Sequence, residues 1–389
     1  MKLRRALWLL LSFIGVLLIG FAAWLFSLPP TSEFRGLSPI GSTENDEVVR
    51  ALHPPKRERP VIAIIGLNRA TETTDYLMPY GILRRADIAD VFLLSVQGGA
   101  VQLYPALKVE SEASIAQFDA RYPNGADYVI VPAMEPRDDP DVLAWIRKQA
   151  YSGAKIIGVC AGATVVAASG LLEGKRAVTH WFYLDDLLKI DPSVSPVGDR
   201  RYVVDHNVAT TTGISASMPM SLTLIEAIAG RDKATQVAQE LGLGFWDARH
   251  ETDAFKITRP FATTVMANRF AAWDHENWGM ELRSGQDEVA LALVADAWSR
   301  TYRSTVATFS EGGRPVISRN GVHIIPDQPA APVAAARFPE LSLAERPPAL
   351  LLNDTLEAIS RRYGARTAEV VAMQLEYPWR PGPVKRTGH

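Results

Sequence analysis

The chain has 389 residues, of which 47% are hydrophobic and 22% charged, and its 41 Lys and Arg residues nearly balance its 43 Asp and Glu residues. This composition is that of a globular protein and excludes a disordered or collagen-like chain. The formal net charge of -2 gives no sign of a polyanion-binding surface, so nucleic acid is not an expected partner. With the single cysteine Cys160, the chain forms neither an internal disulfide nor a cysteine-rich metal site.

The N-terminal residues have the pattern of a membrane anchor. Three basic residues are followed by an uncharged stretch over residues 6–28, which is long enough to cross a bilayer. The basic flank favours a cytoplasmic N-terminus and an extracytoplasmic body, on the periplasmic side in a Gram-negative bacterium. A cleaved signal peptide is the alternative, but the apolar stretch does not end in a small-residue cleavage site. We expect a cytoplasmic tip and single-pass anchor over residues 1–30, with the lipid bilayer as partner, and a linker over residues 31–58.

From residue 59 onward, short apolar runs alternate with helical stretches, a pattern typical of buried parallel strands joined by helices. We therefore expect an α/β domain over residues 59–245, with a mostly parallel sheet sandwiched by helices. The predicted strands are 61–66, 91–96, 128–132, 155–159, 201–204 and 208–211. The predicted helices are 74–86, 140–151, a small-residue helix that ends at residue 170, and 215–229.

Residues 246–389 are expected to form a C-terminal α+β extension. Within it, a helix, a strand, a Gly-Gly turn and a second strand are predicted at 288–302, 305–309, 312–313 and 322–325. The same order occurs at 75–86, 91–96, 98–99 and 107–109, which indicates a degenerate partial repeat. The order is also common in unrelated proteins, so an accidental likeness remains the alternative.

The last part of the extension is predicted to be a connector followed by helices. Residues 326–351 are rich in Pro and Ala, as connectors are, and residues 355–375 have the pattern of two short helices about Gly364. The spacing over residues 356–375 also fits a helix-turn-helix, but an ordinary helical hairpin is the more common structure with this pattern.

The sharpest local feature is Gly158-Val159-Cys160-Ala161-Gly162, which lies between a predicted strand and a predicted helix. This placement is typical of a nucleophile elbow, where a strained turn needs small neighbours and holds the nucleophile above the sheet. The helix N-terminus would favour the thiolate, and the N–H groups of Ala161 and Gly162 would hold an oxyanion. A buried structural cysteine is the alternative.

Three segments together resemble the DJ-1/PfpI superfamily, the class I glutamine amidotransferase-like fold. They are the elbow, Val178-Thr179-His180-Trp181, and Thr212-Gly213-Ile214-Ser215-Ala216 at the start of a long helix. They are most similar to isonitrile hydratases and to the amidotransferase-like domains fused to AraC-type regulators. The resemblance covers residues 59–230 and implies a flavodoxin-like α/β fold. Members commonly pair through their α/β domains, so it also implies a homodimer.

The resemblance further implies an acidic residue four positions before a proline in the first helix of the domain. Counting back from Pro79 gives Asp75, and Glu72 is the next candidate. A carboxyl there exchanges a proton with the thiol or the substrate, whereas a helix-capping acid is the alternative. His180 is expected to act as a base or to stabilise the thiolate, whereas a histidine bonded to backbone is the alternative. A hydroxyl-bearing residue often stands at the position of Ala161 in the isonitrile hydratase-like branch, so alanine argues against that specific reaction.

These observations predict a membrane-anchored cysteine hydrolase or hydratase that acts on a small carbonyl, amide or isonitrile-like substrate. The catalytic residues would be Cys160, Asp75 and His180, with Ala161, Gly162 and Glu72 at the substrate. A non-catalytic ligand-binding or redox-sensing regulatory module is the alternative. No cofactor and no metal is expected, because the sequence has no Gly-rich phosphate loop of Rossmann or Walker type and adjacent Asp274-His275-Glu276 side chains do not converge on one ion.

Overall fold

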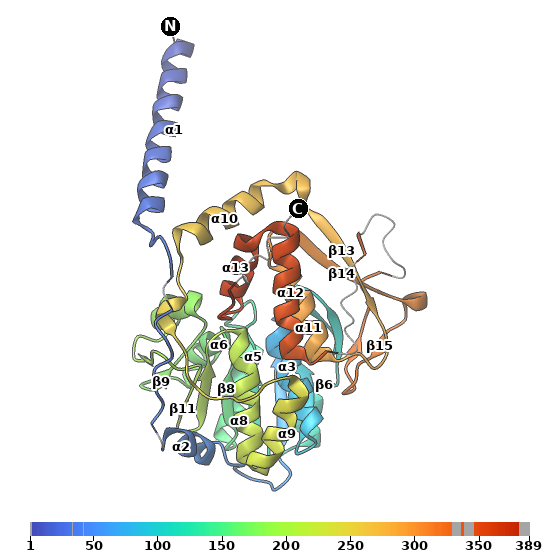
Figure 1. The fold of residues 1–389 in the computed structure, drawn as a ribbon. Helices are drawn as coiled ribbons and strands as arrows, with labels where there is room; N and C mark the ends of the chain where they lie inside the picture. Colours follow the sequence, from blue (N-terminus) through green and yellow to red (C-terminus); the bar gives the residue numbers. More distant parts are fainter. Residues whose placement is uncertain (1, 33, 42, 329–335, 338–345, 381–389) are drawn as a thin grey trace.

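The computed structural model describes residues 2–32, 34–41, 43–328, 336–337 and 346–380. Helix α1 (Lys2–Ser27) projects from a body in which helices cover β-sheets (Figure 1). Residues Trp8–Ser27 form a helix near the N-terminus with mean hydropathy 2.5 and no part buried against the body. This helix is long and apolar enough to cross a membrane, a property that it shares with signal sequences.

The α/β domain is built on a seven-stranded sheet with the strand order β11-β12-β8-β7-β1-β3-β6. Its neighbouring strands run parallel, except that β11 pairs antiparallel with β12 at one edge. The strands are β1 (Val61–Gly66), β3 (Asp90–Ser95), β6 (Ala113–Ser114), β7 (Tyr128–Val131), β8 (Lys155–Gly158), β11 (Tyr202–Asp205) and β12 (Val208–Thr211). The predicted mostly parallel sheet is therefore confirmed.

Helices cover both faces of this sheet because successive side chains of a strand point to opposite faces. Ile62 and Ile64 of β1 pack into one hydrophobic cluster, whereas Val61, Ala63 and Ile65 pack into the other. The first cluster includes α3 (Thr73–Ala86), α8 (Ser217–Ala229) and α9 (Arg231–Leu241). The second includes α4 (Ile115–Arg121), α5 (Pro140–Tyr151), α6 (Gly162–Ala168) and α7 (Leu184–Ile190).

Part of the expected linker is folded onto the α/β domain. Residues Glu44–Ala51 form helix α2, and the next residue, Leu52, is buried in the same core as α3. The hydroxyl of Tyr128 donates a hydrogen bond of 2.6 Å to the backbone carbonyl of Leu52. The prediction of a linker over the whole of residues 31–58 is therefore wrong, because the apolar residues within it are used to cover the sheet.

The C-terminal extension adds strands and helices to the same body. A five-stranded sheet, β15-β16-β5-β4-β2, combines strands of the α/β domain with strands of the extension. Its members are β2 (Arg69–Glu72), β4 (Gly99–Tyr104), β5 (Lys108–Ser111), β15 (Val316–Ile317) and β16 (His323–Ile324). A three-stranded sheet contains β13 (Glu276–Leu282), β14 (Ser304–Ser310) and β17 (Ala336–Arg337), and β9 (Arg176–Ala177) pairs with β10 (Ser195–Pro196).

The helices of the extension share a core with the α/β domain. They are α10 (Arg259–Phe270), α11 (Glu288–Ser299), α12 (Pro348–Tyr363) and α13 (Ala365–Gln374). Leu293 and Trp298 of α11 belong to the same buried cluster as Tyr76 and Leu83 of α3. The predicted helix pair about Gly364 is confirmed by α12 and α13, whereas residues 329–335 and 338–345 of the predicted connector lie outside the described residues.

Helix α6 starts in close contact with the end of β7, and Gly162 makes this contact fit. A Cβ atom on Gly162 would lie 2.0 Å from the carbonyl oxygen of Val131, inside any allowed contact distance. We expect Gly162→Ala to lower the free energy of unfolding by about 2–4 kcal/mol, because the backbone of α6 or β7 must move. Urea unfolding followed by circular dichroism measures this loss.

Gly198→Ala is the matched control, because a Cβ at Gly198 meets no atom within 4 Å. This substitution should change the free energy of unfolding by less than about 0.5 kcal/mol. Equal stability of the two variants would show that α6 and β7 do not approach each other as described.

Candidate active site

Cys160 lies in a strained turn between β8 and α6. Its φ of 56° is in the left-handed region, which non-glycine residues rarely adopt. The turn is held from two sides, since the Cys160 N–H donates to Thr211 Oγ1 over 3.1 Å and Thr179 Oγ1 donates to the Cys160 carbonyl over 3.0 Å. A strained residue that its neighbours fix in place is a feature of active sites, and the strand-to-helix turn has the geometry expected of a nucleophile elbow.

The two expected oxyanion donors differ in what they bind. Burial and the neighbouring acids raise the pKa of the Cys160 thiol, and the Ala161 N–H offsets part of this rise, so it lies near where a developing charge would be. The Gly162 N–H instead donates to the carbonyl of Val159 over 2.7 Å. The prediction of Gly162 as an oxyanion donor is therefore wrong, because its N–H closes the turn and its lack of a side chain serves the contact with β7.

Two buried carboxyl groups from the start of α3 flank the thiol. Glu72 Oε2 accepts hydrogen bonds from the Asp75 N–H over 2.6 Å and from Thr74 Oγ1 over 2.8 Å. Asp75 is fully buried, and its Oδ2 accepts from the Ala133 N–H over 3.1 Å. Its other oxygen, Oδ1, is buried and has no hydrogen-bond partner among the described residues. Both carboxyls interact electrostatically with Cys160, so the structure brings these three expected residues together.

The extension contributes a buried arginine that the sequence analysis did not identify. Arg300, at the end of α11, donates through Nη2 to Glu72 Oε1 over 2.7 Å. Its Nε donates to both carboxylate oxygens of Asp296, over 2.9 and 2.7 Å. The site therefore contains three carboxyl groups and one guanidinium, and its composition depends on both parts of the chain.

The protonation of the site follows from burial and from this excess of acids. Burial, then the charge of Glu72, raises the pKa of Asp75 well above its ordinary value. Burial also raises the pKa of Asp296. Burial, then the charges of Asp75 and Glu72, raises the pKa of the Cys160 thiol. Asp75 Oδ1 has no hydrogen-bond partner among the described residues, so we place a proton there. The raised pKa of the thiol acts against the thiolate that the helix N-terminus is expected to favour.

His180 is bonded to backbone groups through both ring nitrogens. Its Nδ1 accepts from the Phe182 N–H over 3.2 Å, and its Nε2 lies 3.0 Å from the carbonyl of Gln374. Because a carbonyl only accepts, Nε2 carries the proton, and burial lowers the pKa of the ring so that it stays neutral. Neither nitrogen is left for the thiol, so the expected role of His180 as a base is not supported by this geometry.

Both motif segments that follow the elbow bind the chain's own C-terminal residues. The Glu376 carboxylate accepts from the Gly213 N–H over 2.6 Å and from the Trp181 N–H over 3.4 Å, and it lies 2.8 Å from Nε2 of His250. Ser215 Oγ donates to the Glu376 carbonyl over 2.6 Å. The sequence analysis missed Glu376, which is buried and whose charge also raises the pKa of Cys160.

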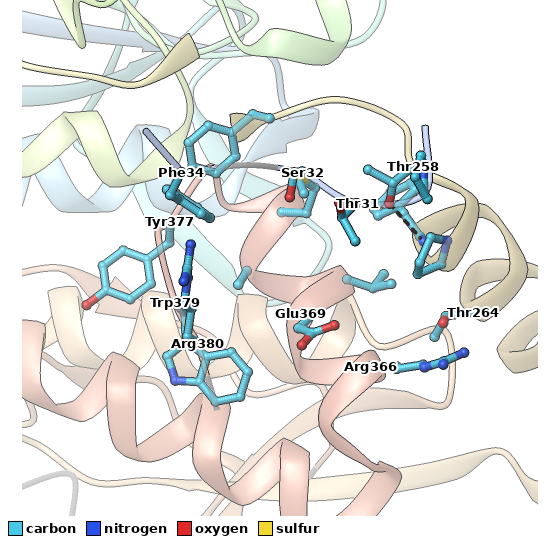
Figure 2. Close-up of a pocket in the computed structure, with 17 residues that line it drawn as sticks. Thr31, Ser32, Phe34, Thr258, Thr264, Arg366, Glu369, Tyr377, Trp379 and Arg380 are labelled. Carbon is cyan, nitrogen blue, oxygen red and sulfur yellow. Dashed lines mark hydrogen bonds between the residues drawn. The ribbon is translucent and has the colours of Figure 1, made fainter. Parts of the chain in front are cut away.

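A cavity of about 450 Å³ is lined in part by residues of α13. Figure 2 shows its labelled side chains, which come from the segment after α1, from α10 and from α13 with the residues that follow it. Met373 lines the cavity, while its carbonyl accepts from Trp181 Nε1 over 2.8 Å. Cys160 is not among the lining residues. In the described part of the chain, no three His, Cys, Asp or Glu side chains gather into a metal site.

The α/β domain has recognisable relatives among known proteins. Residues 61–227 match the model of the DJ-1/PfpI family. The isonitrile hydratase of Pseudomonas putida is 41% identical over 119 residues, which are 31% of this chain and 49% of that protein. The HTH-type transcriptional regulator CdhR of Pseudomonas aeruginosa is 29% identical over 209 residues, 53% of this chain and 59% of that protein. The chain thus spans about half the length of these curated relatives.

Two solved structures are also similar to this chain over about half of its length. Drosophila melanogaster DJ-1beta is 24% identical, covers 48% of this chain and 100% of its own, and gives a TM-score of 0.44. An AraC family transcriptional regulator from Pseudomonas putida is 18% identical, covers 47% of this chain and 99% of its own, and gives a TM-score of 0.42. Arg300 and Glu376 lie outside residues 61–227, the part of the chain that matches the family model.

The buried acid next to the thiol has a measurable effect on stability. Because the pKa of Asp75 is raised, the native state holds a proton that the unfolded state releases above the ordinary value of 3.8. Stability is therefore lost as the pH rises through the window from 3.8 to the raised pKa. An Asp75→Asn variant lacks this loss, so its melting temperature should gain on that of the wild type between pH 4 and pH 8.

Thermal unfolding at a series of pH values tests this expectation, with Asp87→Asn as control. Arg59 lowers the pKa of the exposed Asp87, so that removing this carboxylate should give no gain as the pH rises. If the melting temperature of Asp75→Asn minus that of the wild type stays constant or falls as the pH rises, Asp75 does not hold a buried proton.

Proposed function

Residues 61–227 of this chain form a DJ-1/PfpI family domain, and from its Cys160 site we propose that the protein is a cysteine-dependent hydratase or hydrolase acting on a small isonitrile-like, amide or carbonyl substrate. The observation that carries the proposal is the strained Cys160 turn beside the partnerless oxygen of Asp75. The Pseudomonas putida relative, an isonitrile hydratase, supports hydration of an isonitrile as the reaction to test first. Ala161 argues against this reaction, so amides and carbonyl compounds are tested beside the isonitrile.

The protonation of the site favours addition over attack by a preformed thiolate. Burial raises the pKa of both Cys160 and Asp75, which favours the protonated form of each group at rest. A terminal isonitrile carbon accepts a proton and a nucleophile at the same atom. We infer that Asp75 gives its proton to this carbon, that a C–S bond forms to Cys160, and that the thiol proton returns to Asp75.

The second half of the reaction returns the thiol. Water adds to the carbon of the resulting thioimidate, the C–S bond breaks, and the sulfur takes back a proton, which leaves an N-substituted formamide. The net change is the addition of one water molecule, with no oxidation or reduction. The Ala161 N–H, which acts to lower the pKa of the thiol against the larger effects of burial and the neighbouring acids, would stabilise the charge that passes through the thiolate.

A ligand-binding module is the second candidate, and one specific observation favours it. Residues Met373 to Glu376 already bind the two motif segments through backbone and side-chain hydrogen bonds. Cys160 is only 5% exposed, so in this conformation the domain holds a segment of its own chain beside a closed thiol. The HTH-type transcriptional regulator among the relatives fits a domain that recognises rather than converts a ligand.

Turnover of an isonitrile by the full chain separates the two candidates. We expect formation of a formamide from a small aliphatic isonitrile, measured by loss of the isonitrile infrared band. Cys160→Ser should lower the rate at least about 100-fold, and Asp75→Asn about 10²- to 10⁴-fold, because each removes a group that reacts directly.

Asp127→Asn is the matched control for the loss of a buried carboxyl. Asp127 is fully buried and accepts from the Val61 N–H at the opposite end of the strands from Cys160. Its rate should stay within about twofold of the wild type at temperatures where the variant is folded. Binding of the isonitrile that survives in Cys160→Ser, with no turnover in the wild type, would support the ligand-binding module instead.

We also propose that α1 anchors the protein in a membrane, with α10 lying at the surface of the bilayer. Arg259, the first residue of α10, donates to the carbonyls of Leu25, Phe26 and Leu28, over 3.3, 3.0 and 3.3 Å. Its N–H also donates to the Pro29 carbonyl over 2.9 Å. These bonds occupy carbonyls at the C-terminal end of α1, so they fix that helix to the start of α10.

The far end of α10 carries exposed aromatic side chains on the same end of the body. Figure 1 shows α10 crossing the end of the body from which α1 projects. Phe270 is 76% exposed, and Trp273, in the short turn after α10, is 87% exposed. Aromatic residues at this level are typical of the membrane–water interface. The anchor and this aromatic pair would therefore hold the body close to the lipid headgroups.

Spin labelling tests this placement in the full chain reconstituted into lipid nanodiscs. Cys160→Ser removes the single native cysteine, so that the label then reacts only with the introduced one. A nitroxide on Trp273→Cys should collide more often with oxygen, which dissolves in lipid, than with a water-soluble nickel complex. The control is Tyr151→Cys at the end of α5, which is also 87% exposed and should favour the nickel complex. Equal behaviour of the two labels would contradict contact with the bilayer.

A further inference from the structure

Two segments of the chain repeat one another at a constant spacing of 215 residues. Helix α3 begins with Glu72, whose side chain accepts from the N–H of Asp75, and helix α11 begins with Asp287, whose side chain accepts from the N–H of Ala290. Each member of the second pair stands 215 positions after its counterpart. The two helices therefore start with the same capping contact at equivalent positions.

The strands after the two helices follow the same spacing. In β4 and β5, Val101 pairs with Val109, and in β15 and β16, Val316 pairs with Ile324. The bend inside each hairpin is closed by the same bond, from Leu103 N to the Leu107 carbonyl over 3.0 Å and from Ser318 N to the Val322 carbonyl over 2.9 Å. The spacing of 215 residues is the same for each of these equivalent positions. An order of elements that is common by chance would not give this residue-by-residue agreement.

Backbone conformation gives independent support. The helix ends carry left-handed residues at equivalent positions, Asp87 with φ 49° and Tyr302 with φ 59°. The following turns carry a left-handed glycine at equivalent positions, Gly98 and Gly313. Non-glycine residues seldom adopt such φ values, so the shared pair at Asp87 and Tyr302 is informative.

The two copies contact each other as the halves of a symmetric dimer do. Arg300 binds Glu72 across the interface between α3 and α11, and Arg85, the counterpart of Arg300, binds Asp287, the counterpart of Glu72. In a twofold interface, if residue i of one half contacts residue j of the other, then residue j of the first half contacts residue i of the second. The two ion pairs follow this rule. Val109 of β5 pairs antiparallel with Ile324 of β16, its own equivalent, which places these residues at the local twofold axis.

We propose that residues 276–325 are a partial copy of residues 61–110 that occupies the place of a second subunit on the α3 face and supplies Arg300 to the Cys160 site as a positioning residue. Gly81 shows how closely this face is filled, since a Cβ there would lie 2.4 Å from Glu288 Oε1. The copy leaves this face no room for another chain, so the protein does not form a homodimer through it.

The repeat contains its own control, because only one of the two equivalent ion pairs adjoins a thiol. Arg300 and Glu72 interact electrostatically with Cys160, whereas Ala290 stands at the counterpart of Asp75 and the copy ends before any elbow. Arg85 and Asp287 form the equivalent ion pair on the other side of the axis, in which the arginine is buried and Asp287 is partly exposed. The two arginines therefore differ in their effect on Cys160 and share their role in packing.

The charged and titratable groups that act on this site come from four parts of the chain. They are Glu72 and Asp75 at the start of α3, Asp296 and Arg300 at the end of α11, His180 and Tyr183 after β9, and Glu376 after α13. The thiol titrates at alkaline pH, where the carboxyls are increasingly ionised with or without Arg300. In a variant without Arg300, extra protons on the acids therefore replace only part of the lost positive charge, and the pKa of the thiol rises.

The test compares Arg300→Gln with Arg85→Gln in the full chain in detergent micelles. The rate of Cys160 alkylation is measured against pH, a readout that does not require turnover. Although this inference rests on the proposed Cys160 site, it can thus fail or succeed separately from the proposed activity. We expect Arg300→Gln to move the midpoint upward by about 0.5 to 1 pH unit, which slows alkylation about 3- to 10-fold below the midpoint.

Both variants should lose melting temperature, because each removes the guanidinium of a largely buried ion pair. Arg85→Gln should keep the wild-type midpoint, and Arg300→Lys should restore much of the shift. Equal midpoints for Arg300→Gln and Arg85→Gln would overturn the positioning role. If Arg300→Gln does not fold, the test rests on Arg300→Lys. The alkylation midpoint of this variant must then lie above that of the wild type by less than the shift expected for Arg300→Gln.

The mass of the full chain tests the occupied face. Native mass spectrometry should give one chain of 42.6 kDa per particle. A dimer that dissociates when Arg85→Asp is introduced would overturn the proposal, because it would show that the α3 face binds a second chain.

Discussion

The site depends on the ion pairs that the buried guanidinium of Arg300 forms with two carboxyl groups. The guanidinium binds Glu72 on one side and Asp296 on the other, and both carboxyls lie in surroundings where an unpaired charge is unfavourable. Glu72 in turn holds the N–H of Asp75, and Asp75 adjoins Cys160. The arrangement of acids beside the thiol is therefore set by a residue of the extension. The α/β domain without residues 246–389 would expose these carboxyls to water and lose the electrostatic balance described above.

Much of the fold and part of the site could be predicted from the sequence. The buried strands of the α/β domain are continuous apolar runs, which is why β1 and β12 were predicted with their observed bounds. Cys160 was identified because small residues at a strand-to-helix turn are a local pattern, whereas Asp75 was identified because the family resemblance implies an acid four positions before a proline. The fold of residues 31–58 could not be predicted, because the apolar residues of α2 are few and find packing partners only in the folded body.

Long-range contacts explain what the sequence analysis missed. Arg300 lies 228 positions from Glu72, and Glu376 lies 163 positions from Gly213. No local pattern indicates either contact. The repeated order of elements did contain a signal, because it makes Arg300 the equivalent of Arg85, but a pair that exchanges partners is visible only in the structure. His180 illustrates the opposite case, since its position fits a catalytic base while its two nitrogens bind backbone groups.

The central claim is that Cys160 is a protonated nucleophile at rest, with its proton chemistry shared with Asp75. The most direct test is the ionisation of the single thiol in the unmodified full chain, measured by thiolate absorbance at about 240 nm against pH. We expect a midpoint above the ordinary cysteine value of about 8.5, because burial and the neighbouring acids raise the pKa of the thiol. A midpoint below about 7 would show a preformed thiolate and would contradict the account.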